Sequence, residues 1–106
     1  MYIIDHIKDK NTLKSHVVLK NANNTSKAKI FLNLGGSLQN LILNKNVIIK
    51  GLHPLKYDAS YASAILFPFV NRVKEGTYKF MQKEYKLAIT LKEENNAIHG
   101  LVYNKE

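Results

Sequence analysis

Arg72 and His99 are the two residues whose types and surroundings point most directly to chemistry. Arg72 is the only arginine among 16 basic residues, and it lies in the stretch PFVNRVKEGTY, residues 68–78. Arginine presents a rigid planar fork of donors, whereas lysine is a flexible point charge. Because the chain otherwise uses lysine, the arginine indicates a position where donor geometry matters. His99 lies in NNAIHG, so each motif places a donor close to a glycine.

A purely structural role is the competing interpretation for both residues. Arg72 would then form a salt bridge that holds its loop, with Asp58 or Glu75 as the expected partner, and spacing alone leaves this as open as a binding role. Taken as a single residue, His99 favours a buried histidine that is hydrogen-bonded to the backbone. The residues by themselves therefore leave the functional and the structural interpretations side by side.

Other catalytic or cofactor-binding motifs are absent from the sequence. His6, His16 and His53 have no mutual spacing typical of a metal site. The chain contains no cysteine, which excludes a disulfide framework and a thiolate metal site. It has neither a nucleophile elbow nor a phosphate-binding glycine loop. The glycines of LGGSL indicate only a turn between strands. The sequence therefore predicts no metal and no cofactor.

The net charge of +8 does not define a partner. Its lysines are scattered singly along the chain and often alternate with apolar residues, which is typical of the solvent face of strands. We therefore predict no nucleic-acid binding, and a basic β domain that binds a polyanion remains the least favoured alternative. The N-terminal stretch is unlike a signal peptide, and no apolar run approaches the roughly 20 residues of a membrane span. The sequence thus predicts a soluble, cytoplasmic protein without membrane contact.

The chain of 106 residues is about the size of one small domain. In most of its apolar runs, hydrophobic residues recur at every second position, which is the period of a β-strand. The apolar positions of the two clearest runs are Ala28, Ile30, Leu32 and Leu34, and Tyr85, Leu87, Ile89 and Leu91. Turn residues separate such runs, and Asn44 to Asn46 are predicted to form the turn of a hairpin. Residues 51–63 form the one long irregular segment. The pattern predicts an all-β meander of about eight short strands.

Three sequence blocks resemble the aldose 1-epimerases, the galactose mutarotase family. They are GGSLQNLILNKNVIIKG, YASAILFPFVNRVKEGTYKFMQKEYKL and NNAIHGLV, in the order in which the family carries them. The similarity covers residues 27–106, and residues 1–26 would form variable opening strands of the same incomplete domain. Many relatives carry glycine in the turn occupied here by residues 81–83, and a second glycine at the position of Leu101. These departures concern local loop shape.

The resemblance implies a fold and a function. The chain would be the N-terminal part of a large antiparallel β-sandwich that binds a free hexose such as galactose or glucose. Asn71, Arg72 and His99 align with sugar-binding positions of the family. The implied reaction interconverts the α and β anomers by acid–base ring opening and needs no cofactor. A non-catalytic carbohydrate-binding β module remains the alternative.

The family's catalytic histidine and glutamate are expected beyond residue 106. The glutamates of this chain do not lie in the family's glutamate motif; those considered are Glu75, Glu84, Glu93 and Glu94. The 106 residues therefore resemble a fragment that is inactive alone. Such a fragment would expose strand edges and apolar surface, which predicts self-association.

Overall fold

The computed structural model describes residues 1–10, 15–51 and 55–105. Short antiparallel strands dominate it, and nine strands are present in this part of the chain, against the eight or so expected. The predicted all-β class is thereby confirmed. The chain separates into two compact units, which we treat individually: unit 1 is Met1–Ile65 with Val102–Glu106, and unit 2 is Leu66–Leu101.

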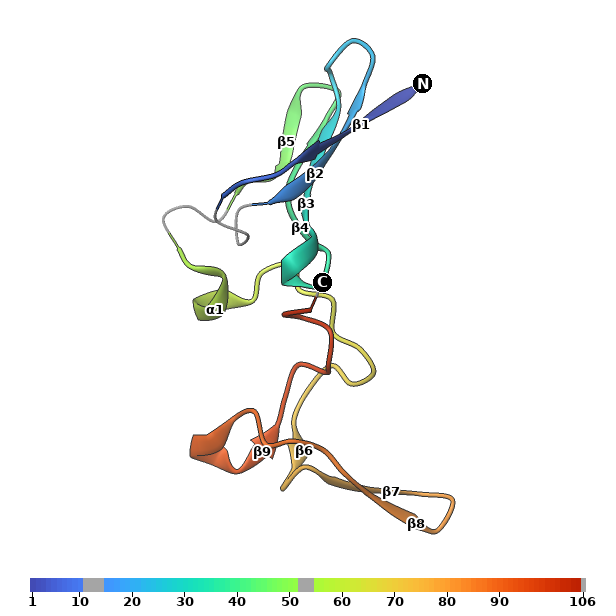
Figure 1. The fold of residues 1–106 in the computed structure, drawn as a ribbon, viewed down its shortest axis with the longest axis vertical. Helices are drawn as coiled ribbons and strands as arrows, with labels where there is room; N and C mark the ends of the chain where they lie inside the picture. The colour runs from blue at the N-terminus through green and yellow to red at the C-terminus, as the bar shows by residue number, and fades with distance from the viewer. Residues whose placement is uncertain (11–14, 52–54, 106) are drawn as a thin grey trace. The chain divides into compact units, whose positions relative to one another are not determined.

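Unit 1 is built on one five-stranded antiparallel sheet (Figure 1). The strands occupy the sheet in the order in which they occur in the sequence, so each is paired with its sequence neighbour. Their bounds are β1 Tyr2–Ile7, β2 His16–Asn21, β3 Lys27–Phe31, β4 Ser37–Leu43 and β5 Asn46–Ile49. This is the meander predicted from the alternating pattern, because short turns favour pairing between neighbours.

The hairpin predicted at Asn44 to Asn46 joins β4 to β5. Its loop residues Asn44 and Lys45 have φ values of 48° and 67°. Two successive positive φ values are characteristic of the tight turn whose twist matches that of the flanking strands. Ser26 supports the turn, since its Oγ accepts a hydrogen bond of 3.1 Å from the backbone N–H of Asn44.

The run from Ala28 to Leu34 does not remain a strand to its end. β3 stops at Phe31, and Leu32–Leu34 forms a 3₁₀ helix, so the strand predicted over its last three residues is wrong. The reason lies in Gly35, which has a φ of 63° and donates its N–H to the carbonyl of Lys105 at 2.8 Å. A Cβ atom at Gly35 would lie 2.0 Å from the carbonyl oxygen of Val102, so the backbones pass too closely for the strand to continue.

Residues 51–63 contain the short helix α1, Tyr57–Ser60. Residues 52–54 of this segment, including His53, lie outside the described residues. The hydroxyl of Tyr57 donates to the carbonyl of Tyr103 at 2.9 Å, which fixes the helix to the C-terminal residues of unit 1. Within the described residues, no helix has the length and apolar character needed to cross a bilayer.

Unit 2 consists of two small antiparallel ladders and a 3₁₀ helix, Lys92–Glu94. Its strands are β6 Val73–Lys74, β7 Thr77–Phe80, β8 Lys83–Lys86 and β9 Asn96–Ala97. The strand predicted from Tyr85 to Leu91 ends at Lys86. Its partner β7 begins only at Thr77, opposite Lys86, because the preceding residues turn away with positive φ.

Little apolar surface is buried in either unit. Among the described residues, Val18 at 6% exposure and Ala97 at 1% are the only buried hydrophobic side chains. Many larger apolar side chains are exposed, although 45% of the chain is hydrophobic. Domains normally bury such residues between two packed layers. The described residues thus form secondary structure and bury few apolar side chains.

Candidate functional site

The pairing of β6 with β9 brings the predicted site residues to one end of a ladder. Val73 pairs with Ala97, and the strands are antiparallel. Asn71 and Arg72 directly precede β6, whereas His99 follows β9 by two residues. In an antiparallel pair the start of one strand lies beside the end of the other. The two motifs, far apart in the sequence, therefore meet at this end.

A second connection between the two motifs is made by Phe67, which precedes Asn71 in the sequence, and Gly100, which follows His99. Phe67 forms a bridge with Gly100, and the N–H of Leu101 donates to the carbonyl of Phe67 at 2.7 Å. Gly100 has a φ of 72°, and a Cβ atom there would lie 2.3 Å from the carbonyl oxygen of Phe67. The contact therefore requires glycine. It explains physically why the imidazole of His99 is followed by a residue without a side chain.

Arg72 is held by a two-pronged ion pair with Glu94. Its Nε lies 2.6 Å from Oε2 of the carboxylate, and its Nη2 donates to Oε1 at 3.2 Å. The side chains are 50% and 46% exposed. The salt bridge considered from the sequence is therefore present, but both partners named for it, Asp58 and Glu75, are wrong. The fork geometry that lysine lacks is used here.

The ion pair shifts both groups toward their charged forms. The hydrogen bond from Arg72, ahead of the charge attraction, holds the pKa of Glu94 below its usual value, while the same contact raises the pKa of Arg72. Glu94 also accepts a hydrogen bond of 3.3 Å from the side-chain amide of Asn96. The oxygen of that amide accepts from the backbone N–H of Glu75 at 3.2 Å. Arg72 is thus tied to the loop that follows β6.

Arg72 retains binding capacity beyond this pair. A guanidinium group has five N–H donors, and the pair with Glu94 uses two of them. Its half-exposed side chain can therefore donate to a ligand while Glu94 fixes its direction. Asn71 is exposed, and its side-chain oxygen accepts a hydrogen bond of 2.8 Å from the N–H of Arg72. This contact uses the oxygen of the Asn71 amide and not its two N–H donors.

His99 is only half-buried, and its backbone has a φ of 68°. A positive φ is uncommon outside glycine and often marks a residue that its surroundings hold in place. Thr90 provides part of that hold, since its hydroxyl accepts from the N–H of Ile98 at 2.9 Å and donates to the carbonyl of Ile98 at 3.2 Å. The imidazole is thus presented from a fixed backbone.

Glu94, Asn96 and Thr90 are the positioning residues that the sequence analysis missed. A usable signal was present for Glu94 and Asn96, which lie in the polar run EENN, residues 93–96, at the start of the histidine motif. Thr90 gave no comparable signal, because a threonine in an alternating apolar run is ordinary in a strand. Its role depends on the turn at the 3₁₀ helix, after which Asn96 pairs with Leu91 and the hydroxyl of Thr90 reaches Ile98.

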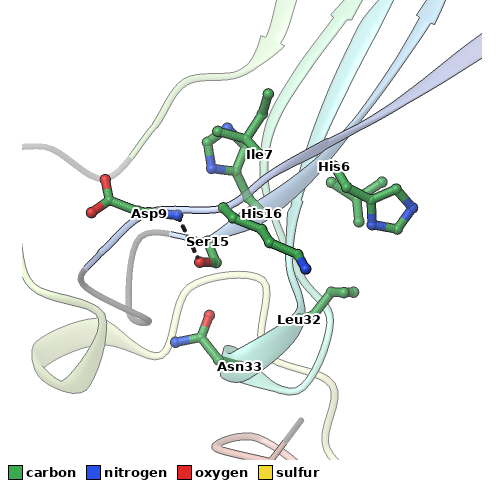
Figure 2. A pocket seen from close by; sticks show the side chains of 9 residues that line it. His6, Ile7, Asp9, Ser15, His16, Leu32 and Asn33 are labelled. Carbon is green, nitrogen blue, oxygen red and sulfur yellow. Dashed lines mark hydrogen bonds between the residues drawn. The ribbon is translucent and has the colours of Figure 1, made fainter.

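A second polar region lies in unit 1 and is shown in Figure 2. It is a hollow of about 320 Å³ lined by His6, Ile7, Lys8, Asp9, Ser15, His16, Val17, Leu32 and Asn33. Asp9 donates its backbone N–H to the hydroxyl of Ser15 at 3.0 Å, and His16 stacks on Phe31 at 5.0 Å between ring centroids. In the part of the chain that the structure describes, no three His, Asp or Glu side chains are grouped to hold a metal.

Comparison with solved structures defines the class of the fold. A galactose mutarotase-like protein from Clostridium acetobutylicum matches with a TM-score of 0.69 and 26% identity, over 100% of this chain and 32% of that one. A galactose 1-epimerase from Lactobacillus acidophilus has the same fold, with a TM-score of 0.65 and 20% identity, again over 100% of this chain and 32% of its own. The chain thus spans about a third of the length of these structures, and its fold is mutarotase-like.

The sequence profile described as aldose 1-epimerase matches residues 15–106. The chain belongs to the aldose 1-epimerase family, which confirms the resemblance found in the three sequence blocks. No curated protein matches the chain.

Proposed function

We propose that this chain supplies the sugar-binding part of an aldose 1-epimerase, an isomerase that interconverts the α and β anomers of a free hexose such as galactose or glucose. Asn71, Arg72 and His99 are the proposed sugar contacts. The observation that carries the proposal is the double connection around them. The β6–β9 ladder pairs the two motifs on one side of the three residues, and the Phe67–Gly100 bridge pairs them on the other. The chain also belongs to the aldose 1-epimerase family.

The chemistry of these three side chains suits a hydroxyl-rich ligand. A neutral sugar is recognised by donors and acceptors that are fixed in direction before it binds. The ion pair with Glu94 fixes the fork of Arg72, and the hydroxyl of Thr90 fixes the backbone beside His99. Donors aimed at the ring oxygen also stabilise the charge that develops when the ring opens. Recognition and charge stabilisation are thus the roles we assign to this chain.

The proton transfers require an acid and a base that we do not assign to these 106 residues. Glu94 is the carboxylate nearest the proposed contacts by hydrogen bonding, but Arg72 lowers its pKa. A group held ionised in this way is a weak base and donates no proton near neutral pH. We therefore propose that the isolated chain does not accelerate mutarotation, because each acid or base typically contributes about 10² to 10⁴-fold in rate.

A chimera tests the proposal. It joins this chain to the two thirds of the Clostridium acetobutylicum protein that have no counterpart here. Polarimetry on freshly dissolved α-galactose and α-glucose should show mutarotation by the chimera and only the spontaneous rate with the isolated chain. Sugar binding by a folded but inactive chimera would favour the non-catalytic carbohydrate-binding module. Acceleration by the isolated chain would show that the acid and base lie within it.

A further inference from the structure

Three lysines from two strands lie together on one face of the five-stranded sheet in unit 1. Lys20 of β2 is paired directly with Lys27 of β3, and Lys29 lies two residues farther along β3. Paired residues, and residues two apart in a strand, place their side chains on the same face of a sheet. We call Lys20, Lys27 and Lys29 the lysine cluster. The pairing of β2 with β3 creates this group from lysines that are scattered in the sequence.

The lysine cluster has an excess of positive charge. Lys20 forms an ion pair of 2.7 Å with Asp5, whereas Lys27 and Lys29 form no ion pair among the described residues. Three ammonium groups and one carboxylate leave a local charge of +2. Like charges directly opposite each other, as at Lys20 and Lys27, destabilise a pair of strands. The arrangement therefore favours a bound anion with two negative charges.

The side chains of the cluster are held against the sheet. All three lysines are half-buried, and the side chain of Lys20 is 30% exposed. Val18, which is paired with Lys29, is 6% exposed. Lysine covers apolar surface with its methylene stem while its ammonium group stays in water. Side chains that are partly ordered in this way lose less freedom when a ligand binds.

A hollow of about 380 Å³ adjoins the cluster. Lys27 and Lys29 form part of its wall, together with Phe31, Gln39 and Asn40. Side-chain amides can donate to and accept from uncharged oxygen groups, and an aromatic ring packs against carbon. The hollow can therefore hold the uncharged part of a small molecule whose anionic group lies at the lysines.

A β-bulge contributes one wall of this hollow. In the β3–β4 ladder Lys29 pairs with Asn40, and the next residue of β3 pairs with Leu38. Gln39 therefore has no partner on β3. Bulges re-aim side chains and are frequent beside functional sites. The amide nitrogen of Gln39 is also buried without a hydrogen-bond partner among the described residues, which is rare for a donor. A bound oxygen that reaches this nitrogen would supply the missing acceptor.

We propose that the lysine cluster and the adjoining hollow form a binding site for a phosphate monoester of a small polar molecule. A phosphate monoester carries a charge of about −1.5 to −2 at pH 7, which matches the local excess, and its oxygens accept charge-assisted hydrogen bonds from ammonium groups. A single carboxylate would leave one positive charge unbalanced. The proposal does not depend on the sugar contacts, which lie in unit 2.

A nucleic acid is the less favoured occupant of the cluster. A long phosphate backbone requires a stripe of basic residues along its path. Here the row that contains Lys20 and Lys27 meets Ile3 on β1 and Ile42 on β4, so apolar residues bound the lysines on both sides. A single phosphate group fits this compact arrangement better than an extended backbone.

The experiment titrates the 106-residue chain with three probes at constant ionic strength, followed by calorimetry and by amide NMR. The probes are glycerol 3-phosphate, inorganic phosphate and glycerol. Glycerol 3-phosphate should bind about threefold more tightly than inorganic phosphate, because its carbon atoms reach the hollow, and glycerol should not bind. The amide signals of Lys29 and Gln39 should shift, whereas those of Arg72 and His99 in unit 2 should not.

Two variants of the cluster and one control locate the binding. Lys27→Gln and Lys29→Gln each remove one charge and should raise the Kd for glycerol 3-phosphate at least about fivefold. Lys56→Gln, at an exposed position directly before α1, should change it less than about twofold. Removing a lysine from the cluster also relieves repulsion, so the melting temperature of the two cluster variants should not fall.

Four outcomes would overturn the proposal. They are equal weakening by the cluster variants and Lys56→Gln, equal affinity for glycerol 3-phosphate and inorganic phosphate, tighter binding of a random-sequence DNA duplex that the cluster variants abolish, and binding that the isolated chain shows but the chimera lacks. The last would mean that the rest of the polypeptide covers this face. Absence of mutarotation by a chimera that still binds glycerol 3-phosphate would contradict only the proposed function.

Discussion

Unit 1 and unit 2 reach a defined backbone by different means. In unit 1 five strands pair in sequence order, and ladder hydrogen bonds define each neighbour, with a register shift in the β3–β4 and β4–β5 ladders. In unit 2 the longest strands have four residues, and β6 and β9 have only two. Its irregular segments are fixed by side-chain hydrogen bonds, by the close glycine contacts at Gly76 and Gly100, and by several residues with positive φ. Regular pairing builds the sheet, and individual contacts build the candidate site.

This difference shows where function and stability are separable. A long ladder distributes its energy over many equivalent bonds, so a single substitution on its solvent face changes little. The candidate site depends on a few contacts that cannot be exchanged, such as the Phe67–Gly100 bridge and the Arg72–Glu94 pair. Substitutions at these contacts of unit 2 should therefore have larger and more specific effects than substitutions on the solvent face of the unit 1 sheet.

The largest expected effect follows from adding a methyl group at Gly100. Gly100→Ala would place a Cβ atom 2.3 Å from the Phe67 carbonyl oxygen, in a backbone conformation with a φ of 72°. The bridge must then open, so we expect a loss of at least about 2 kcal/mol of unfolding free energy in the chimera. Thermal unfolding and polarimetry measure the two consequences, and mutarotation should be lost as well.

Gly51→Ala in unit 1 is the matched control for this change. Among the described residues, a Cβ atom at Gly51 would meet the carbonyl oxygen of Gln39, at an ordinary 3.8 Å. Its effect on the unfolding free energy should stay within about 1 kcal/mol. Equal effects of the two substitutions would mean that the Phe67–Gly100 bridge does not hold the site, and the contrast between the units would fail.

Replacing Arg72 by lysine should have the next largest effect. Arg72→Lys keeps the charge but removes the fork, so the direction of the donors toward the sugar is lost. We expect kcat/KM of the chimera to fall about a hundredfold, as when an aimed donor to a developing charge is removed. Polarimetric progress curves at several galactose concentrations provide the measurement.

Two further variants separate sugar binding by Arg72 from its structural role. Lys79→Ala, at an exposed position of β7, controls for the loss of an ordinary lysine and should leave kcat/KM within about twofold. Glu94→Gln removes the charge of the ion-pair partner but keeps Arg72 itself. If Arg72→Lys and Glu94→Gln lower the melting temperature equally and leave turnover normal, the ion pair is the whole function of Arg72.

A smaller effect is expected at His99, with the change in activity exceeding the change in stability. His99→Asn should lower kcat/KM at least about tenfold, equivalent to about 1.4 kcal/mol of transition-state binding. Its half-buried position should keep the change in unfolding free energy within roughly 1 kcal/mol. Both quantities need to be measured on one preparation of the chimera. A destabilised variant with normal turnover would remove His99 from the site.

The sequence predicted the regular parts of the fold better than the irregular ones, for a physical reason. Alternating residues such as those of β3 report which side of a strand is apolar, and Asn44 with Lys45 has the turn chemistry of a hairpin. The end of β3 depends instead on the approach of Gly35 to Val102, which lies far away in the sequence. Patterns of neighbouring residues do not contain that information.

The candidate site shows the same limit. Its residues were recognisable because two motifs resemble a family, and the β6–β9 ladder brings those motifs together. The partner of Arg72 was not predictable, because spacing favours near neighbours such as Glu75. Glu94 reaches Arg72 only after β9 pairs with β6 and a 3₁₀ helix turns its carboxylate back.

The smallest expected effect concerns the pH dependence of the Arg72–Glu94 pair. Arg72 lowers the pKa of Glu94, chiefly through the side-chain hydrogen bond. A carboxylate whose folded-state pKa is lowered stabilises the fold above its unfolded pKa and loses that contribution as the pH falls through the folded value. The difference in melting temperature between the parent chimera and Glu94→Gln should therefore be constant near neutral pH and shrink below about pH 4.

Both groups of this pair are exposed, so the difference should be small and should also decrease with added salt. Glu93→Gln is the control, because Glu93 belongs to the same 3₁₀ helix and forms no ion pair among the described residues. Its melting temperature should follow that of the parent at every pH. If Glu94→Gln behaves like Glu93→Gln, the ion pair does not stabilise the fold. The fork of Arg72 would then be positioned by Asn71 and the β6–β9 ladder, and Arg72→Lys should still reduce activity.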